Sequence, residues 1–188
     1  MPEDKLEGFK ARFATAIQQE IGATPVDILI LGPSIGRNNR RKSAALRRVL
    51  LGRCNSLGGR VLGVIAEHRE LIKVARKEMG KGYNLCSYEM KLAKHCDLVI
   101  LLPDSPGSFA ELGLFAQTDS VCQKSLILFN QNHKNNRSFI MEGPRRAYSF
   151  RKASIKYVDY SAVDKVVLIV KDAIDQVRVV KADRQKFG

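Results

Sequence analysis

The amino-acid sequence predicts an α/β protein with a Rossmann-like, doubly wound sheet, mainly parallel and of about five strands, flanked by N- and C-terminal helices. Short apolar runs bounded by Gly, Pro or polar residues alternate with amphipathic helical segments along the chain. Hydrophobic residues make up 45% of the 188 residues, enough for a sizeable core. At roughly 150 residues per domain, this length predicts a single domain over residues 1–188.

The expected elements follow one another as helices and strands in turn. Apolar residues at helical spacing indicate a leading helix over 1–22, with Gly22 as a stop signal. Strands are expected at 26–31, 61–65, 98–102, 125–129 and 155–158. Helices are expected at 37–53, 69–79, 83–96, 108–117 and 161–180, the last beginning with a capping box of Ser161 and Asp164.

The composition narrows the range of functions. The net charge of +13 favours an anionic partner such as nucleic acid, a nucleotide or acidic lipid, although a solvated basic surface also explains it. The four cysteines form no C-x-x-C pair, so we expect free thiols, no metal and no cofactor. The first ten residues carry no signal-peptide core and the apolar runs are too short to span a bilayer, which predicts a cytoplasmic protein without a membrane anchor.

The first candidate site directly follows the strand at 26–31. Its residues are Gly32, Pro33, Ser34 and Gly36. Glycines at this point let the backbone approach a ligand, and the N-terminus of the following helix favours an anion. A plain strand-to-helix turn is the alternative interpretation.

The second candidate site follows the most hydrophobic strand. Its candidate ligand-binding residues are Asp104, Ser105, Gly107, Ser108 and Phe109. Gly107 exposes backbone amides at a helix start, where they can hold a phosphate or a ribose hydroxyl. Glu111 is expected in the first helical turn, where the helix dipole favours a carboxylate able to attack an anomeric carbon or stabilise an oxocarbenium ion. In the alternative interpretation, Ser108 and Glu111 form only a capping box. The context argues against this alternative: a strand, a Pro-Gly turn, the Glu, and then Gly113, which would allow close helix packing.

Two further candidates are single residues. Asn130 follows the strand at 125–129, where its amide can read a base or ribose edge, and Phe109 or Phe139 can stack on a base. Glu89 lies on the helix before the central strand and can point into the crevice. A polar loop and a solvated carboxylate are the respective alternatives.

A run of basic residues is expected on the helix at 37–53. Helical spacing places Arg40, Arg41, Arg47 and Arg48 on one face and Leu46, Val49 and Leu50 on the opposite face. Arg37 begins the run. The basic face is either solvated or contacts a phosphate backbone.

The stretch 83–115, ending in DLVILLPDSPGSFAELGLF, and the segment SFIMEGP at 138–144 resemble the nucleoside 2-deoxyribosyltransferase-like superfamily. The resemblance is greatest to antiphage effectors found beside retron reverse transcriptases. It implies a Rossmann-like fold, cleavage of an N-glycosidic bond, and a catalytic glutamate at Glu111. It places the ribose- and phosphate-binding turn at Gly107 and Ser108 and the first-strand loop at 32–36.

For the effector branch, the resemblance implies a nucleotide, nucleoside or NAD substrate and control by a reverse transcriptase and its DNA. It also implies an oligomer, since such active sites often close at a subunit interface. The leading hypothesis is therefore an N-glycosidase that serves as a bacterial antiphage defence effector. The alternatives are a non-catalytic nucleotide sensor and a nucleic-acid-binding subunit that uses the basic helix at 37–53.

Overall fold

The computed structural model describes residues 3–36, 38–58 and 60–187, and it confirms the predicted fold class. Within these residues, five strands pair in parallel in the order β2-β1-β3-β4-β5. The strands are β1 (Val26–Leu31), β2 (Val61–Val64), β3 (Leu98–Leu101), β4 (Ser125–Asn130) and β5 (Ser154–Val158). The central strands are almost continuously apolar because helices cover both faces of a parallel sheet.

Helices connect the strands and flank them at both ends of the chain. They are α1 (Glu3–Ala23), α2 (Lys42–Ser56), α3 (Arg69–Met79), α4 (Leu85–His95), α5 (Pro106–Phe115), α6 (Asp119–Cys122), α7 (Phe139–Phe150) and α8 (Val163–Phe187). Short 3-10 helices lie at η1 (Gly80–Gly82) and η2 (Gln131–His133). The predicted capping box at Ser161 is wrong: α8 begins two residues later, and the Ser161 N–H donates to Asp159 Oδ1 at 2.8 Å.

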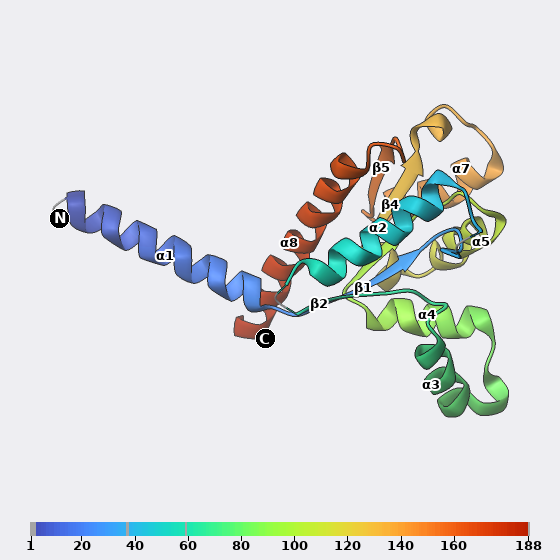
Figure 1. Cartoon of the computed structure of the whole chain (residues 1–188), viewed down its shortest axis with the longest axis horizontal. Helices are drawn as coiled ribbons and strands as arrows, with labels where there is room; N and C mark the ends of the chain where they lie inside the picture. The colour runs from blue at the N-terminus through green and yellow to red at the C-terminus, as the bar shows by residue number, and fades with distance from the viewer. Residues whose placement is uncertain (1–2, 37, 59, 188) are drawn as a thin grey trace.

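Alternate residues of each strand enter two separate cores, one on each face of the sheet. Leu29, Val99 and Ile127 belong to the core that also contains Tyr88 of α4, Phe115 of α5 and Tyr148 of α7. Ile28, Ile100 and Leu126 belong to the other core, with Leu46 of α2 and Val170 of α8. In Figure 1, α2 and α8 lie together on one side of the sheet. This arrangement brings the carboxyl ends of the strands to one edge, where the predicted site residues follow them.

The leading helix α1 contacts the rest of the protein over only part of its length. Figure 1 shows α1 projecting from the sheet, and the end of α1 near the sheet lies beside α8. Phe9 and Phe13 stack on each other at 5.8 Å between ring centroids while more than half exposed. Among the described residues, no helix combines the length and apolar character needed to cross a membrane.

Gly32 ends β1 in a conformation that only glycine adopts readily. Its φ is +146°, and a Cβ there would lie 3.1 Å from both the Cβ and the carbonyl oxygen of Leu102. The glycine thus permits the close approach of the ends of β1 and β3. The expected close packing at Gly113 is wrong, because a Cβ on that residue would meet nothing within 4 Å.

We therefore expect Gly32→Ala to lower the free energy of unfolding by about 2 kcal/mol or more, through backbone strain and the clash with Leu102. Gly113→Ala, in the interior of α5, should instead raise it by about 0.5–1 kcal/mol. Urea denaturation followed by circular dichroism measures both. Equal stability of Gly32→Ala and the unsubstituted chain would contradict the assigned role of Gly32.

Candidate functional site

Nine residues separate Gly32 from the start of α2 at Lys42, so the helix expected at 37–53 begins later than predicted. The loop holds itself together by local hydrogen bonds. The Asn39 side-chain amide donates to the Ser34 carbonyl oxygen at 2.7 Å, and the Gly36 N–H donates to Ser34 Oγ at 3.4 Å. Arg48 donates to the carbonyl oxygens of Ile35 and Gly36 at 3.1 and 3.3 Å. Ligand binding by Ser34 and Gly36 stays a prediction, and Arg37 lies outside the described residues.

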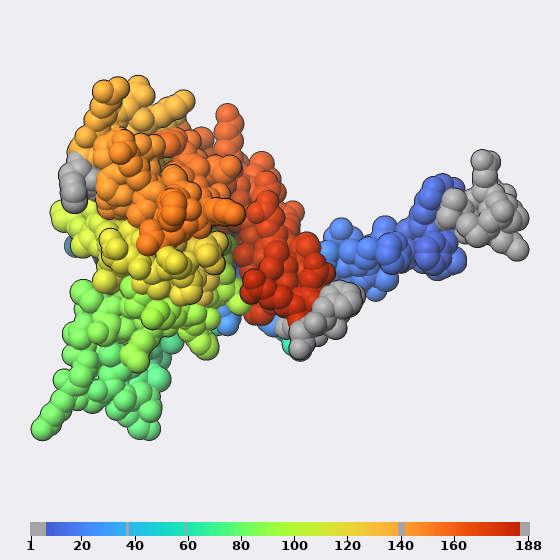
Figure 2. Space-filling model, turned by 180° about the vertical axis from the view of Figure 1, so that it is seen from behind, coloured from blue at the N-terminus to red at the C-terminus, as the bar shows by residue number. Residues whose placement is uncertain are grey.

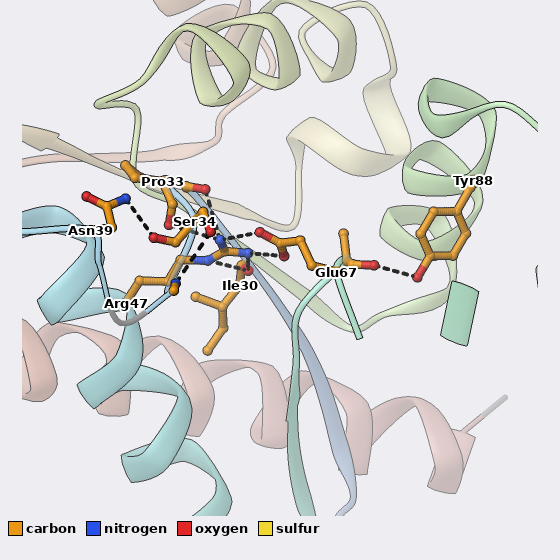
Figure 3. Close-up of polar contacts among 10 residues, drawn as sticks. Ile30, Pro33, Ser34, Asn39, Arg47, Glu67 and Tyr88 are labelled. Carbon is orange, nitrogen blue, oxygen red and sulfur yellow. Dashed lines mark hydrogen bonds and ion pairs between the residues drawn. The ribbon is translucent and has the colours of Figure 1, made fainter. Parts of the chain in front are cut away.

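Arg47 lies inside the protein, with 1% of its side chain exposed. Its guanidinium donates to the carbonyl oxygens of Ile30, Gly32 and Pro33 at 2.8–3.1 Å. It also forms two bonds of 2.8 Å to the carboxylate of Glu67 (Figure 3). The prediction that Arg47 belongs to a solvated or phosphate-binding basic face is therefore wrong.

The spacing along α2 explains why Arg47 is buried. Ser43, Arg47, Leu50 and Cys54 occupy positions i, i+4, i+7 and i+11, and all four are buried. Val49, predicted on the apolar face, is 36% exposed. The signal for a buried arginine was thus present in the sequence as the continuation of an apolar stripe.

The loop after β3 is fixed by side chains from both of its ends. Ser105 Oγ accepts the Ser108 N–H at 3.2 Å, and Ser108 Oγ accepts the Ser105 N–H at 2.9 Å. This reciprocal pair is the capping box of α5, so the predicted box of Ser108 and Glu111 is wrong. Asp104 links the loop to the start of α2, because its carboxylate accepts the Ser43 hydroxyl and its carbonyl oxygen accepts Arg41.

Glu111 lies in the second turn of α5, because the helix begins at Pro106 rather than at Ser108. Burial, reinforced by the negative charge of Glu89, raises the pKa of Glu111 to about 8. The expectation that the helix dipole keeps Glu111 ionised is therefore wrong, since desolvation outweighs the dipole beyond the first turn. At neutral pH the carboxyl group is mostly protonated and able to donate a proton.

Two buried polar atoms near each other lack a protein partner. Glu111 Oε2 and the Tyr148 hydroxyl have no hydrogen bond within the described part of the chain. Burial is the main cause of a raised pKa at Tyr148, and the charge of Glu111 adds to it. Because buried polar atoms are normally paired, such atoms mark places where substrate or water binds.

Two further carboxyl groups act electrostatically on Glu111. Glu89 on α4 is 8% exposed, and burial together with the charge of Glu67 raises its pKa, while Arg47 opposes the shift. Glu67 follows β2 and forms the ion pair with Arg47. The sequence interpretation missed Glu67, although its place after the carboxyl end of a strand was the signal. Across the described residues, no group of three or more His, Cys, Asp or Glu side chains is arranged to hold a metal ion.

A cavity of about 600 Å³ lies beside the N-terminus of α5. It is lined by Arg41, Asp104, Ser105, Pro106, Phe109 and Ala110. Phe109 meets His133 of η2 edge-on at 6.1 Å between ring centroids. The structure thus joins three predicted residues, Asp104, Ser105 and Phe109, around one cavity. The charged groups that act on Glu111 are instead Glu89, Arg47 and Glu67.

The remaining predicted residues lie around this edge of the sheet. Gly107 is exposed at the second position of α5. Asn130 ends β4, and its side-chain oxygen accepts the Asn132 N–H at 3.0 Å. Their binding roles stay predictions, and the side chain of Phe139 lies outside the described part of the structure.

Comparison with known proteins gives a consistent result. The family described as STM3845 retron effector protein matches residues 45–187. A protein of Escherichia coli named "Retron Ec86 putative ribosyltransferase/DNA-binding protein" is 36% identical over 100 residues, which cover 53% of this chain and 32% of the relative. Its Ec73 counterpart, of the same description and organism, is 39% identical over 64 residues, or 34% of this chain and 20% of the relative. The match therefore spans a third or less of each relative.

The buried guanidinium gives a first prediction for this site. We expect Arg47→Met to lower the free energy of unfolding by about 3 kcal/mol or more, because it leaves three carbonyl oxygens and Glu67 without their donor. Arg48→Met, one residue away on the exposed face, should change it by about 0.5 kcal/mol or less. Urea denaturation measures both, and similar values for the two variants would show that Arg47 has no special structural role.

The raised pKa of Glu111 gives a second prediction. A buried acid with a raised pKa stabilises the fold when protonated, and this contribution is lost as the pH rises through the pKa of about 8. Glu111→Gln keeps the neutral form, so at pH 8.5 it should unfold about 3 °C or more above the unsubstituted chain, and the difference should shrink at pH 5.5. Glu78→Gln, an exposed carboxylate on α3, should show no such pH-dependent difference in thermal unfolding.

Proposed function

The chain belongs to the STM3845 retron effector family, and from this we propose that it cleaves the N-glycosidic bond of a nucleotide, nucleoside or NAD as a cytoplasmic antiphage effector. The observation that carries the proposal is Glu111. It is a carboxyl group with a pKa of about 8 and an unpaired buried oxygen, at the ligand-binding edge of a parallel sheet. The word ribosyltransferase in the names of both relatives supports glycosyl-transfer chemistry.

The protonated state of Glu111 suggests its role. As the bond between C1′ and the base nitrogen of a nucleoside or nucleotide breaks, its electron pair leaves with the base, and the Glu111 carboxyl supplies the proton that neutralises the departing nitrogen. The nicotinamide of NAD leaves as a neutral base and needs no proton. Water or an acceptor hydroxyl then attacks the oxocarbenium carbon and loses a proton to the Glu111 carboxylate, which restores the acid. This refines the sequence hypothesis, in which Glu111 acted first as a carboxylate.

We propose that the N-terminus of α5 holds the sugar and phosphate while Glu111 reaches the glycosidic bond. Gly107 offers an exposed backbone amide in the first turn, where the helix dipole favours an anion. Glu111 follows four residues later, a rise of about 6 Å along the helix. Phe109, on the wall of the neighbouring cavity, is placed to stack on a base.

The ion pair between Arg47 and Glu67 supports the proposal that the substrate is anionic. With Glu67 neutralised by Arg47, and with Glu89 and Glu111 biased toward their protonated forms, the carboxyl groups repel a phosphate less than three free carboxylates would. We further propose that the reverse transcriptase and DNA of the retron control this activity.

Release of free base tests the proposal. The protein is incubated with NAD and with a panel of nucleosides and nucleotides, and released base is measured by chromatography. We expect Glu111→Gln to slow release from nucleosides and nucleotides about 10²–10⁴-fold, because the amide cannot supply the proton. For the unsubstituted protein, release should fall as the pH rises above about 8, where Glu111 loses its proton.

Glu78→Gln is the matched control and should release base at the unsubstituted rate. Release that persists in Glu111→Gln would reject the role of this residue. The assay is run both on the isolated chain and on the chain co-expressed with the retron reverse transcriptase and its DNA. Nucleotide binding by calorimetry without release in either preparation would favour a sensor over a glycosidase.

A further inference from the structure

A second cavity, of about 660 Å³, lies at the amino ends of β3, β4 and β5, the edge opposite to Glu111. One wall is the C-terminal half of α8, and the others are the segments that lead into the three strands. Figure 2 shows α8 in red beside these yellow and orange segments. Five lysine or arginine side chains among the described residues line the cavity: Lys94, Lys124, Lys152, Lys181 and Arg184. Asp97 is the single acidic residue among the described lining residues.

Two of the five cations have a structural role. Lys124 donates to the Lys94 carbonyl oxygen at 2.7 Å and to the Cys96 carbonyl oxygen, which closes the C-terminal end of α4. Lys181 pairs with Asp97 at 2.7 Å and donates to the Pro25 carbonyl oxygen at 2.9 Å. These contacts fix the floor of the cavity and neutralise its single carboxylate.

The other three cations are exposed and unengaged. The side chains of Lys94, Lys152 and Arg184 form no hydrogen bond or ion pair with any group in the described part of the chain. They come from three different elements: the end of α4, the turn before β5, and α8. The cavity therefore presents three free positive charges in addition to that of Lys124, because only Lys181 and Asp97 neutralise each other.

The spacing of these cations favours an extended anion. β3 and β5 are two strand spacings, about 10 Å, apart in the sheet, and Lys94 and Lys152 lie on the segments that lead into them. Arg184 continues the α8 face that also carries Val177, Val180 and Lys181 at helical spacing. Three free cations from three elements offer more positive charge than one phosphate group needs, and together they can follow a chain of phosphates.

We propose that this cavity is a groove that binds the phosphodiester backbone of a nucleic-acid strand. Its concave shape admits a strand between α8 and the strand ends, whereas a flat lipid surface cannot reach the floor. Among the described residues, its lining contains no Phe, Tyr or Trp on which bases could stack. Binding is thus through the backbone and independent of base sequence. This site is separate from Glu111 and does not depend on the glycosidase proposal.

Fluorescence anisotropy of the full chain with a labelled single-stranded oligonucleotide of about 20 thymidines, several phosphates longer than the groove, tests the proposal. The test variant is Lys94→Gln, Lys152→Gln and Arg184→Gln combined. The matched control, Arg69→Gln, Lys77→Gln and Lys81→Gln, removes the same charge from exposed positions on and beside α3. Thermal unfolding establishes that both variants are folded.

We expect the groove variant to weaken binding about tenfold or more and to reduce the slope of log K against log salt by about 2, at roughly 0.7 per lost contact with a single strand. The control should change affinity by about threefold or less. Equal losses in the two variants would overturn the proposal in favour of diffuse surface charge. Absence of binding at low salt would also overturn it, as would groove-dependent binding to phosphatidylserine vesicles or free ATP but not to the oligonucleotide.

Discussion

The hydrogen bonds of the buried Arg47 guanidinium are the interaction on which the carboxyl edge of the sheet depends. The guanidinium joins the end of β1, the start of the following loop and Glu67 after β2 in one set of hydrogen bonds. A planar, permanently charged group with several donors can satisfy three carbonyl oxygens and a carboxylate together, which a lysine cannot. Because the loop leaves β1 through Gly32, pressed against Leu102, the positions of the β1 and β3 loops are coupled. Asp104 strengthens this coupling through Ser43 and Arg41.

The same cation sets the charge states of the neighbouring acids. Arg47 fully engages Glu67, so it only partly offsets the burial of Glu89 and Glu111. An acid that is desolvated and faces other acids takes up a proton rather than remain an unpaired buried charge. The pKa of Glu111 is therefore raised mainly because the carboxyl group is buried, and the neighbouring carboxyl groups add to the shift.

The sequence alone predicted the fold and the loops that carry the candidate site residues. It did not predict the burial of Arg47 or the protonation of Glu111. The apolar runs bounded by Gly, Pro or polar residues predicted the ends of β1 and β3 to within one residue. This succeeded because a strand that is buried on both faces of a sheet is continuously apolar. The burial of Arg47 was not predicted, because arginines are usually exposed and its place in the buried stripe of α2 was outweighed by the basic run around it. The protonation of Glu111 depends on Glu89 and Glu67, which are 22 and 44 residues away in sequence and meet it only in the folded chain.

The basic residues behind the net charge of +13 have different roles at the two edges of the sheet. At the carboxyl edge, the charge of Arg47 is neutralised by Glu67, and Arg48 is engaged with loop carbonyls, so the basic residues of α2 partly serve the structure. At the amino edge, three cationic side chains form no hydrogen bond or ion pair with the described part of the chain. A parallel sheet places these two edges on opposite sides of the molecule, so a polyanion held at one edge leaves the other open. The fold therefore allows a bound nucleic-acid strand and a small substrate to be present at the same time, which control of one by the other requires.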